Sequence, residues 1–316
     1  LVNIYNDGSV SLNHGGTEMG QGLNTKVSSI VSEVFCIPFE QIKITQTETS
    51  KIPNTSATAA SSGSDLNGKA AERAALTLKD RLIKFASKHF TVPQEFISFG
   101  YSGVLIGNKL LSFSELVSLA YKERVQLSAL GFYKTPNIYW DRAKGKGEPF
   151  YYFSYGAAVS EVSLDTLTGE YILNRTDILH DVGQTLNESI DIGQIEGGFI
   201  QGVGWLTSEE LFWDDCGRLK THAPSTYKIP LASDTPETLN ISLLQNSPNP
   251  RPTVKRSKAV GEPPFMLSIS VFEALSMAVS SVIDYSTCPN LSTPATPENL
   301  LLTIEKLKSQ NDAKRI

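Results

Sequence analysis

Cysteine is scarce in this chain, with three residues among 316. Cys36, Cys216 and Cys288 lie far apart, and none belongs to a CxxC pair. Zinc and iron–sulfur sites are therefore not indicated, because both need closely spaced thiolates. An odd, sparse set also argues against a disulfide framework and favours a reducing compartment, so we expect a cytoplasmic protein.

Histidine and clustered positive charge are also in short supply. The four histidines are dispersed along the chain, which disfavours a histidine metal site. No run of Lys or Arg is present, and the formal net charge is -5 at pH 7. Because binding to a phosphate backbone needs a basic patch, nucleic acid is not an expected partner.

The sequence has no long uninterrupted apolar run. The most apolar stretch, residues 263–283, contains Glu273 and several serines, so we interpret it as a buried helix and expect no membrane partner. A hydrophobic content of 40% and a charged content of 19% are ordinary for a globular protein, and the length suggests two domains. The chain begins at Leu1 without Met and enters strand-like alternation directly, so we expect a piece of a longer polypeptide.

The first part of the chain combines a hairpin pattern with two stretches of small residues. Apolar and polar residues alternate on both sides of Asp7-Gly8, which predicts a hairpin, and helical spacing follows the glycine-rich residues 15–22. Residues 54–64 are nearly all Ser, Thr, Ala and Gly. This stretch is either a flexible linker or a place where backbone N–H groups meet an anion.

The second part repeats the order of strands followed by a glycine-rich helix. Residues 150–164 and 169–179 are predicted strands, and residues 191–204 have helical spacing despite five glycines. Gly193 and Gly197 lie one turn apart, and the tolerance of five glycines in one helix indicates close approach of another helix or of a ligand. We therefore predict an α+β fold of two related two-layer α/β subdomains, residues 1–145 and 146–316, with mixed sheets packed against helices and a boundary near residues 140–149.

One acidic residue stands in an unusual context, Gly261-Glu262-Pro263-Pro264. Proline suits the first turn of a helix, and glycine lets another group approach the backbone closely. Glu262 is thus expected at a helix N-terminus, where it could be a rigidly held catalytic carboxylate. The same position suits a simple helix cap, because acidic residues are common at helix starts.

Five segments in this order resemble the molybdenum-binding part of the xanthine dehydrogenase family. They are residues 14–22 (HGGTEMGQG), 58–61 (TAAS), 131–136 (GFYKTP), 224–230 (PSTYKIP) and 258–264 (KAVGEPP). The likeness runs from about Leu1 to Glu305 and is closest to the bacterial form, in which the molybdenum subunit is a separate chain. It implies that the chain forms the second domain that binds the molybdenum cofactor.

The resemblance assigns roles to individual residues. It implies that Glu262 is the general base of a molybdenum hydroxylase. It further implies that Ala60 lies with its backbone next to the molybdenum, and that the molybdopterin is held by Gly20, Gln21, Ala59, Ala60, Ser61, Gln201 and Gly261. An amide side chain both donates and accepts hydrogen bonds, which suits the edge of a pterin.

The resemblance also implies a reaction and partners. Pro263 and Pro264 favour a purine hydroxylase that converts hypoxanthine and xanthine to urate. The alternatives are an aldehyde oxidase-type hydroxylase, or an isolated domain that is inactive without its missing parts. FAD and 2Fe-2S clusters are expected on other chains or domains. The expected partners are the N-terminal part of the molybdenum subunit and an iron–sulfur/FAD subunit, in a dimer of heterodimers.

Overall fold

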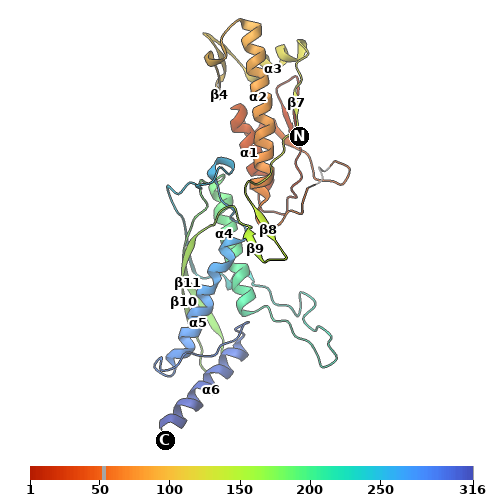
Figure 1. Ribbon diagram of the computed structural model, residues 1–316. Helices are drawn as coiled ribbons and strands as arrows, with labels where there is room; N and C mark the ends of the chain where they lie inside the picture. The colour runs from red at the N-terminus through yellow and green to blue at the C-terminus, as the bar shows by residue number, and fades with distance from the viewer. Residues whose placement is uncertain (52–54, 316) are drawn as a thin grey trace. The chain divides into compact units, whose positions relative to one another are not determined.

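The computed structural model describes residues 1–51 and 55–315, and these residues form two compact units (Figure 1). The first unit contains residues 1–153, 183–190 and 248–259. The second contains residues 154–182, 191–247 and 260–316. Residue 54, where the predicted stretch of small residues begins, lies outside the described residues. Each unit is treated by itself below.

The main sheet of the first unit confirms the predicted N-terminal hairpin. β1 (Val2–Ile4) pairs antiparallel with β2 (Val10–Leu12), and β2 pairs parallel with β3 (Ile42–Ile44). β7 (Ser128–Ala129) completes the order β3-β2-β1-β7. A parallel pair needs a crossover connection, and α1 (Leu23–Phe35) supplies it between β2 and β3.

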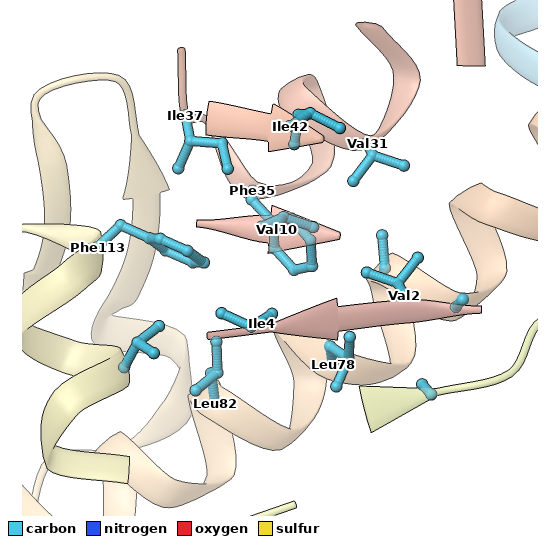
Figure 2. Packing of buried hydrophobic residues seen from close by; sticks show 14 of the residues in the cluster. Val2, Ile4, Val10, Val31, Phe35, Ile37, Ile42, Leu78, Leu82 and Phe113 are labelled. Atoms are coloured by element: carbon cyan, nitrogen blue, oxygen red, sulfur yellow. The ribbon is translucent and has the colours of Figure 1, made fainter. Parts of the chain in front are cut away.

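The core of the first unit lies between this sheet and its helices. Alternate residues of β1 and β2 face inward, which buries Val2, Ile4 and Val10 almost completely (Figure 2). Leu78 and Leu82 of α2 (Lys69–Phe90) pack into the same cluster. Burial of these aliphatic side chains supplies the main stabilisation of the unit.

The remaining elements of the first unit are short. α3 (Phe113–Lys122) begins with a capping box between Ser112 and Glu115, in which each side chain accepts a hydrogen bond from the other residue's N–H. β4 (Ile97–Gly100), β5 (Gly103–Ile106) and β6 (Lys109–Leu111) form an antiparallel sheet. Single helical turns span Phe39–Gln41, Ser64–Gly68, Gln94–Phe96 and Val254–Arg256.

The second unit is built on one three-stranded sheet. β10 (Gly156–Leu164) pairs antiparallel with β11 (Tyr171–His180), which pairs parallel with β12 (Thr238–Leu243). The helices are α4 (Glu188–Thr207), α5 (Ile269–Ser281) and α6 (Pro297–Arg315), with short turns at Ala232–Asp234 and Pro263–Ser268. Ile195, Phe199 and Leu275 are fully buried in its core.

The two units share one arrangement of elements. In the first, the antiparallel pair β1–β2 is followed by α1, and then β3 joins β2 in parallel. In the second, the pair β10–β11 is followed by α4, and then β12 joins β11 in parallel. A further helix, α2 or α5, follows each third strand. The predicted α+β fold of two related units with mixed sheets is thus confirmed.

Two expectations need adjustment. The stretch at residues 140–149 contains most of a two-stranded hairpin, β8 (Tyr139–Asp141) with β9 (Lys146–Glu148), and the predicted boundary between residues 145 and 146 stays a prediction.

Pro263–Ser281 is the one helical stretch among the described residues that is long and apolar enough to cross a membrane. Only one face of it is buried: Val271 is fully enclosed in the core, whereas Met277 is 62% exposed.

Candidate functional site

The glycine-rich loop is organised by a residue that the sequence analysis did not select, Glu18. One carboxylate oxygen, Oε1, accepts hydrogen bonds from the N–H groups of Gly20 (2.9 Å) and Gly22 (3.0 Å). The other, Oε2, accepts one from Asn24 N–H (2.8 Å), in the first turn of α1. Partial burial raises the pKa of Glu18, but these hydrogen bonds outweigh it and hold the pKa below its ordinary value. Glu18 therefore stays ionised and fixes the loop at the start of α1.

Gln21 uses both ends of its amide within the same loop. Oε1 accepts a hydrogen bond from Met19 N–H at 2.5 Å, and Nε2 donates one to Thr17 O at 2.8 Å. The N–H group of Thr17 in turn donates to Oγ1 of Thr58 at 2.8 Å. The structure thus brings the loop with Gly20 and Gln21 to the start of the TAAS segment. One hydrogen of Nε2 and one lone pair of Oε1 remain for a bound group.

The TAAS segment continues as a tight turn. Ser62 N–H donates to Ala59 O at 3.3 Å, and the two residues between them, Ala60 and Ser61, have φ of 55° and 51°. Two successive positive φ values characterise a type I′ turn, which usually contains Asn or Gly. The stretch is therefore an ordered turn, which argues against the flexible-linker interpretation. A non-glycine residue in this region costs about 1–2 kcal/mol, and strain of this kind is typical of ligand-binding segments.

A cavity of about 320 Å³ lies beside this turn. Its wall includes small residues of the segment, such as Thr58 and Ser62, together with His14. His14 is 9% exposed, and its Nδ1 accepts a hydrogen bond from Gly16 N–H at 3.0 Å. Its Nε2 has no hydrogen-bond partner among the described residues. Burial lowers the pKa of His14, and the Asn24 side chain raises it by a smaller amount. The pKa is lowered on balance, so the neutral form of the ring is favoured.

These features fit a planar polar cofactor in the first unit. A Cβ added to Gly20 would meet no described atom within 4 Å, and Ala59 and Ala60 are exposed. Open space, small side chains and a buried imidazole nitrogen at a cavity are what a pterin needs for close approach and hydrogen bonding. Among the described residues, no group of three or more His, Cys, Asp or Glu side chains could hold a metal ion.

Glu262 begins the short helix Pro263–Ser268 in the second unit, as predicted. Two prolines occupy the first helical positions, where the missing N–H groups are not needed. The backbone carbonyl of Glu262 accepts a hydrogen bond from Phe265 N–H at 2.9 Å. Its side chain makes no capping hydrogen bond to this turn and is exposed. The geometry therefore argues against the simple cap.

The glycines of α4 bring its surface against the turn that carries Glu262. A Cβ on Gly198 would lie 3.0 Å from the carbonyl oxygen of Gly261, and one on Gly202 would lie 2.5 Å from that of Phe265. The predicted close approach is thus confirmed at these two glycines, whereas no described atom lies within 4 Å of a Cβ at Gly193 or Gly197. These contacts pack α4, which carries Gln201, against the segment that carries Gly261 and Glu262. The Gln201 side chain itself is exposed.

A second acidic residue that the sequence analysis missed is Asp65, which lies in the helical turn Ser64–Gly68. The Tyr152 hydroxyl donates a hydrogen bond of 2.5 Å to Oδ2 of Asp65 and accepts one of 2.8 Å from Ala259 N–H. Burial raises the pKa of Asp65 to about 6, against the lowering effect of the hydrogen bond from Tyr152. The sequence feature that could have indicated Asp65 is its position directly after the stretch of small residues.

The fold and the first unit's loop and turn define a class of cofactor-binding domain, and comparison with known families identifies the class. The family model described as the molybdopterin cofactor-binding domain matches residues 1–236. Because the match covers well over half of the sequence, the chain belongs to the molybdopterin cofactor-binding domain family.

The relatives within this class are xanthine dehydrogenases, which confirms the resemblance seen in the five segments. The chain is 45% identical over 306 residues to the xanthine dehydrogenase/oxidase of Felis catus, covering 95% of this chain and 22% of the relative. It is 44% identical to the xanthine dehydrogenase of Dictyostelium discoideum, covering 95% of this chain and 21% of the relative. The chain thus spans about a fifth of the length of these relatives.

A solved structure shares the fold at lower identity. CO dehydrogenase from Oligotropha carboxidovorans matches with a TM-score of 0.83 at 21% identity, covering 98% of this chain and 37% of that chain. The two curated relatives named above are eukaryotic, and the expected bacterial form with a separate molybdenum subunit stays a prediction.

Proposed function

We propose that this chain is the C-terminal molybdopterin-binding portion of a molybdenum hydroxylase that converts hypoxanthine and xanthine to urate. The observation that carries the proposal is the 45% identity to a xanthine dehydrogenase over 95% of the chain. The pair Pro263-Pro264 after Glu262 supports a purine substrate over an aldehyde.

The resemblance supports seven residues as the cofactor-binding residues. Gly20 and Gln21 of the glycine-rich loop and Ala59, Ala60 and Ser61 of the strained turn would hold the pterin. Gln201 and Gly261 are proposed on the resemblance alone. The Ala60 backbone would face the molybdenum, because its small side chain leaves the backbone accessible. When bound, the cofactor supplies the centre that accepts two electrons from the substrate.

Glu262 is the proposed general base. In the overall reaction a C–H bond of the purine ring is replaced by a C–O bond, with oxygen from water, and two protons and two electrons are released. The Glu262 carboxylate would accept one of these protons, from the oxygen that becomes bonded to the ring carbon. A base must be ionised and aimed at that proton. The two prolines and the close packing of Gly261 on α4 hold the backbone of Glu262 in one conformation.

The remainder of the enzyme would lie outside this chain. FAD and 2Fe-2S clusters, the rest of the molybdenum-binding part, an iron–sulfur/FAD subunit and a dimer of heterodimers are proposals that rest on the resemblance. A chain that spans about a fifth of its relatives leaves ample length for such parts. A cytoplasmic location is likewise a proposal, supported by the sparse cysteines.

The test is Glu262→Gln in the complete enzyme, with Glu273→Gln as the matched control on exposed surface of α5. We expect Glu262→Gln to retain molybdenum, measured by metal analysis, and to lose xanthine turnover by several orders of magnitude. The control should keep both. Turnover of Glu262→Gln close to that of the wild type would rule out Glu262 as the base.

Two alternatives make different predictions. An aldehyde oxidase-type enzyme would oxidise aromatic aldehydes in preference to xanthine. A cofactor-free domain would contain neither molybdenum nor pterin when this chain is expressed alone, and would not oxidise purines. Measuring both substrates on the complete enzyme and the metal content of the isolated chain separates the three possibilities.

A further inference from the structure

Tyr152 connects two segments of the first unit that are far apart in the sequence. Its hydroxyl donates to Asp65, 87 residues earlier, and accepts from the N–H of Ala259, 107 residues later. Asp65 follows the strained Ala59–Ser62 turn by three residues, and Ala259 precedes Glu262 by three residues. A single hydroxyl thus ties the end of the proposed cofactor turn to the start of the segment with the proposed base.

The segment before Ala259 is itself firmly held. Asn249 is fully buried, and its Nδ2 donates to Ser257 O at 3.0 Å. The Thr253 hydroxyl donates to the same carbonyl at 2.7 Å. Lys255 forms an ion pair with Glu33 of α1. The segment is thus held at Ser257, and the hydrogen bond from Ala259 N–H to the Tyr152 hydroxyl holds it again two residues further along.

The charges around the pair favour this arrangement at neutral pH. Burial raises the pKa of Tyr152, and the carboxylate of Asp65 raises it further, so the hydroxyl stays protonated and donates. The pKa of Asp65, about 6, leaves its carboxylate ionised at pH 7 and able to accept a strong hydrogen bond. Tyr133 also faces Asp65, and the Arg73 guanidinium lies 5.1 Å from the centre of the Tyr133 ring.

We propose that Asp65 and Tyr152 are positioning residues for the Glu262 carboxylate. They fix Ala259, and three residues of chain reach at most about 11 Å, so fixing Ala259 restricts the positions open to Glu262. The inference rests on the proposed role of Glu262 as the base. Positional errors of about 1 Å at a catalytic group can lower the rate about 100-fold, so a remote hydrogen bond of this kind can control turnover.

The test is Tyr152→Phe in the complete enzyme, with Tyr151→Phe as the matched control. The Tyr151 hydroxyl makes no hydrogen bond with the described residues, and its ring stacking with Arg251 is kept by phenylalanine. We expect Tyr152→Phe to lower kcat for xanthine about 10- to 100-fold, with KM and molybdenum content within about twofold of the wild type. Asp65→Asn keeps an acceptor for Tyr152 and should retain most of kcat, whereas Asp65→Ala should resemble Tyr152→Phe.

A double variant separates this inference from the proposed function. If Tyr152 acts through Glu262, then adding Tyr152→Phe to Glu262→Gln should cause no further loss of kcat. If the loss of kcat in the double variant equalled the product of the losses in the two single variants, the inference would be overturned. Unchanged kcat in Tyr152→Phe, or a loss of molybdenum in proportion to the loss of turnover, would also overturn it. These outcomes concern Tyr152 alone. The proposed role of Glu262 fails if Glu262→Gln itself stays active, and the proposed substrate fails if the complete enzyme prefers aldehydes to xanthine.

Discussion

Gly202 of α4 lies directly against Ser268, at the end of the short helix that begins after Glu262. A Cβ on Gly202 would lie 2.3 Å from Oγ of Ser268, well inside van der Waals contact. The Ser268 hydroxyl cannot move away freely, because it donates a hydrogen bond of 2.7 Å to Phe265 O. Any side chain at Gly202 must therefore separate α4 from the turn that holds Glu262.

Gly202→Ala should destabilise the second unit and reduce turnover. The added methyl group meets a backbone carbonyl and a hydrogen-bonded hydroxyl, and overpacking of this kind costs about 1–3 kcal/mol. The free energy of unfolding and kcat should both fall, and denaturant titration and steady-state kinetics measure them.

Gly197→Ala is the matched control on the same helix. No described atom lies within 4 Å of a Cβ at this position, so the change should raise helix stability by up to about 1 kcal/mol. If Gly197→Ala were as damaging as Gly202→Ala, the close packing of Gly202 would not be the cause.

Glu18→Gln should loosen the glycine-rich loop. The variant loses the negative charge of the carboxylate that accepts three backbone hydrogen bonds at the start of α1. Because water screens this exposed position, the free energy of unfolding should fall by only about 1 kcal/mol. A carboxyl group with a lowered pKa stabilises the folded protein above its ordinary pKa and loses this contribution as the pH falls. The difference from the wild type should therefore be largest at neutral pH and shrink in acid.

The control for that experiment is Glu95→Gln, an exposed acidic residue in another short helical turn. The Glu95→Gln variant should have a free energy of unfolding close to the wild-type value at pH 7. A Glu18→Gln variant with the stability of the control at pH 7 would contradict the role given to Glu18.

Ala60 should respond to substitution through its backbone. Ala60→Gly removes the strain of a positive φ and should stabilise the turn by about 0.5–1 kcal/mol, whereas Ala60→Val, with a branched Cβ, should destabilise it by more. We also expect lower molybdenum content in Ala60→Val, because the turn is a proposed part of the cofactor site. Equal metal content in the two variants would argue against that role.

Asp65 should make stability depend on pH in a defined direction. Its pKa in the folded protein is raised from 3.8 to about 6, so the folded state binds a proton that the unfolded state releases. The free energy of unfolding therefore loses this contribution as the pH rises from about 4 to about 6. The difference between the wild type and Asp65→Asn should fall over the same interval and stay constant between pH 7 and pH 8, because the pKa values of the neighbouring Tyr133 and Tyr152 are raised above the ordinary value for tyrosine. Parallel stability curves for the two proteins would contradict this pKa.

Gln201→Ala should weaken cofactor retention without disturbing the helix packing. Gln201 is exposed, and alanine is a better helix former, so the stability of the second unit should not fall. Loss of molybdenum during dialysis should be faster than in the wild type. Gln194→Ala, about two turns earlier on α4, provides the control, and equal molybdenum retention in both variants would count against Gln201.

Periodicity was sufficient to predict most elements of the fold. The alternation around Asp7-Gly8 predicted β1 and β2, and helical spacing predicted α1 and α4, because these patterns reflect which side chains each local geometry turns inward. The position of Glu262 at a helix start also followed from local rules, since proline restricts the backbone wherever it occurs.

Contacts between distant segments could not be predicted in the same way. The five glycines of α4 look equivalent in the sequence, but the close contacts belong to Gly198, Gly202 and Gly204, and no described atom lies within 4 Å of a Cβ at Gly193 or Gly197. Asp65 and Tyr152 are separated by 87 residues, and nothing local marks them as a pair.

The sequence by itself therefore determined the order of the elements, the family and the acidic residue at the helix start, because each of these depends on neighbouring residues. The tertiary structure alone decided which glycines pack closely, that Glu18 orders its loop, and that one tyrosine hydroxyl joins Asp65 to Ala259. The physical reason is that hydrogen bonds and steric exclusion act between atoms a few ångströms apart, and chain folding, not sequence spacing, sets that distance.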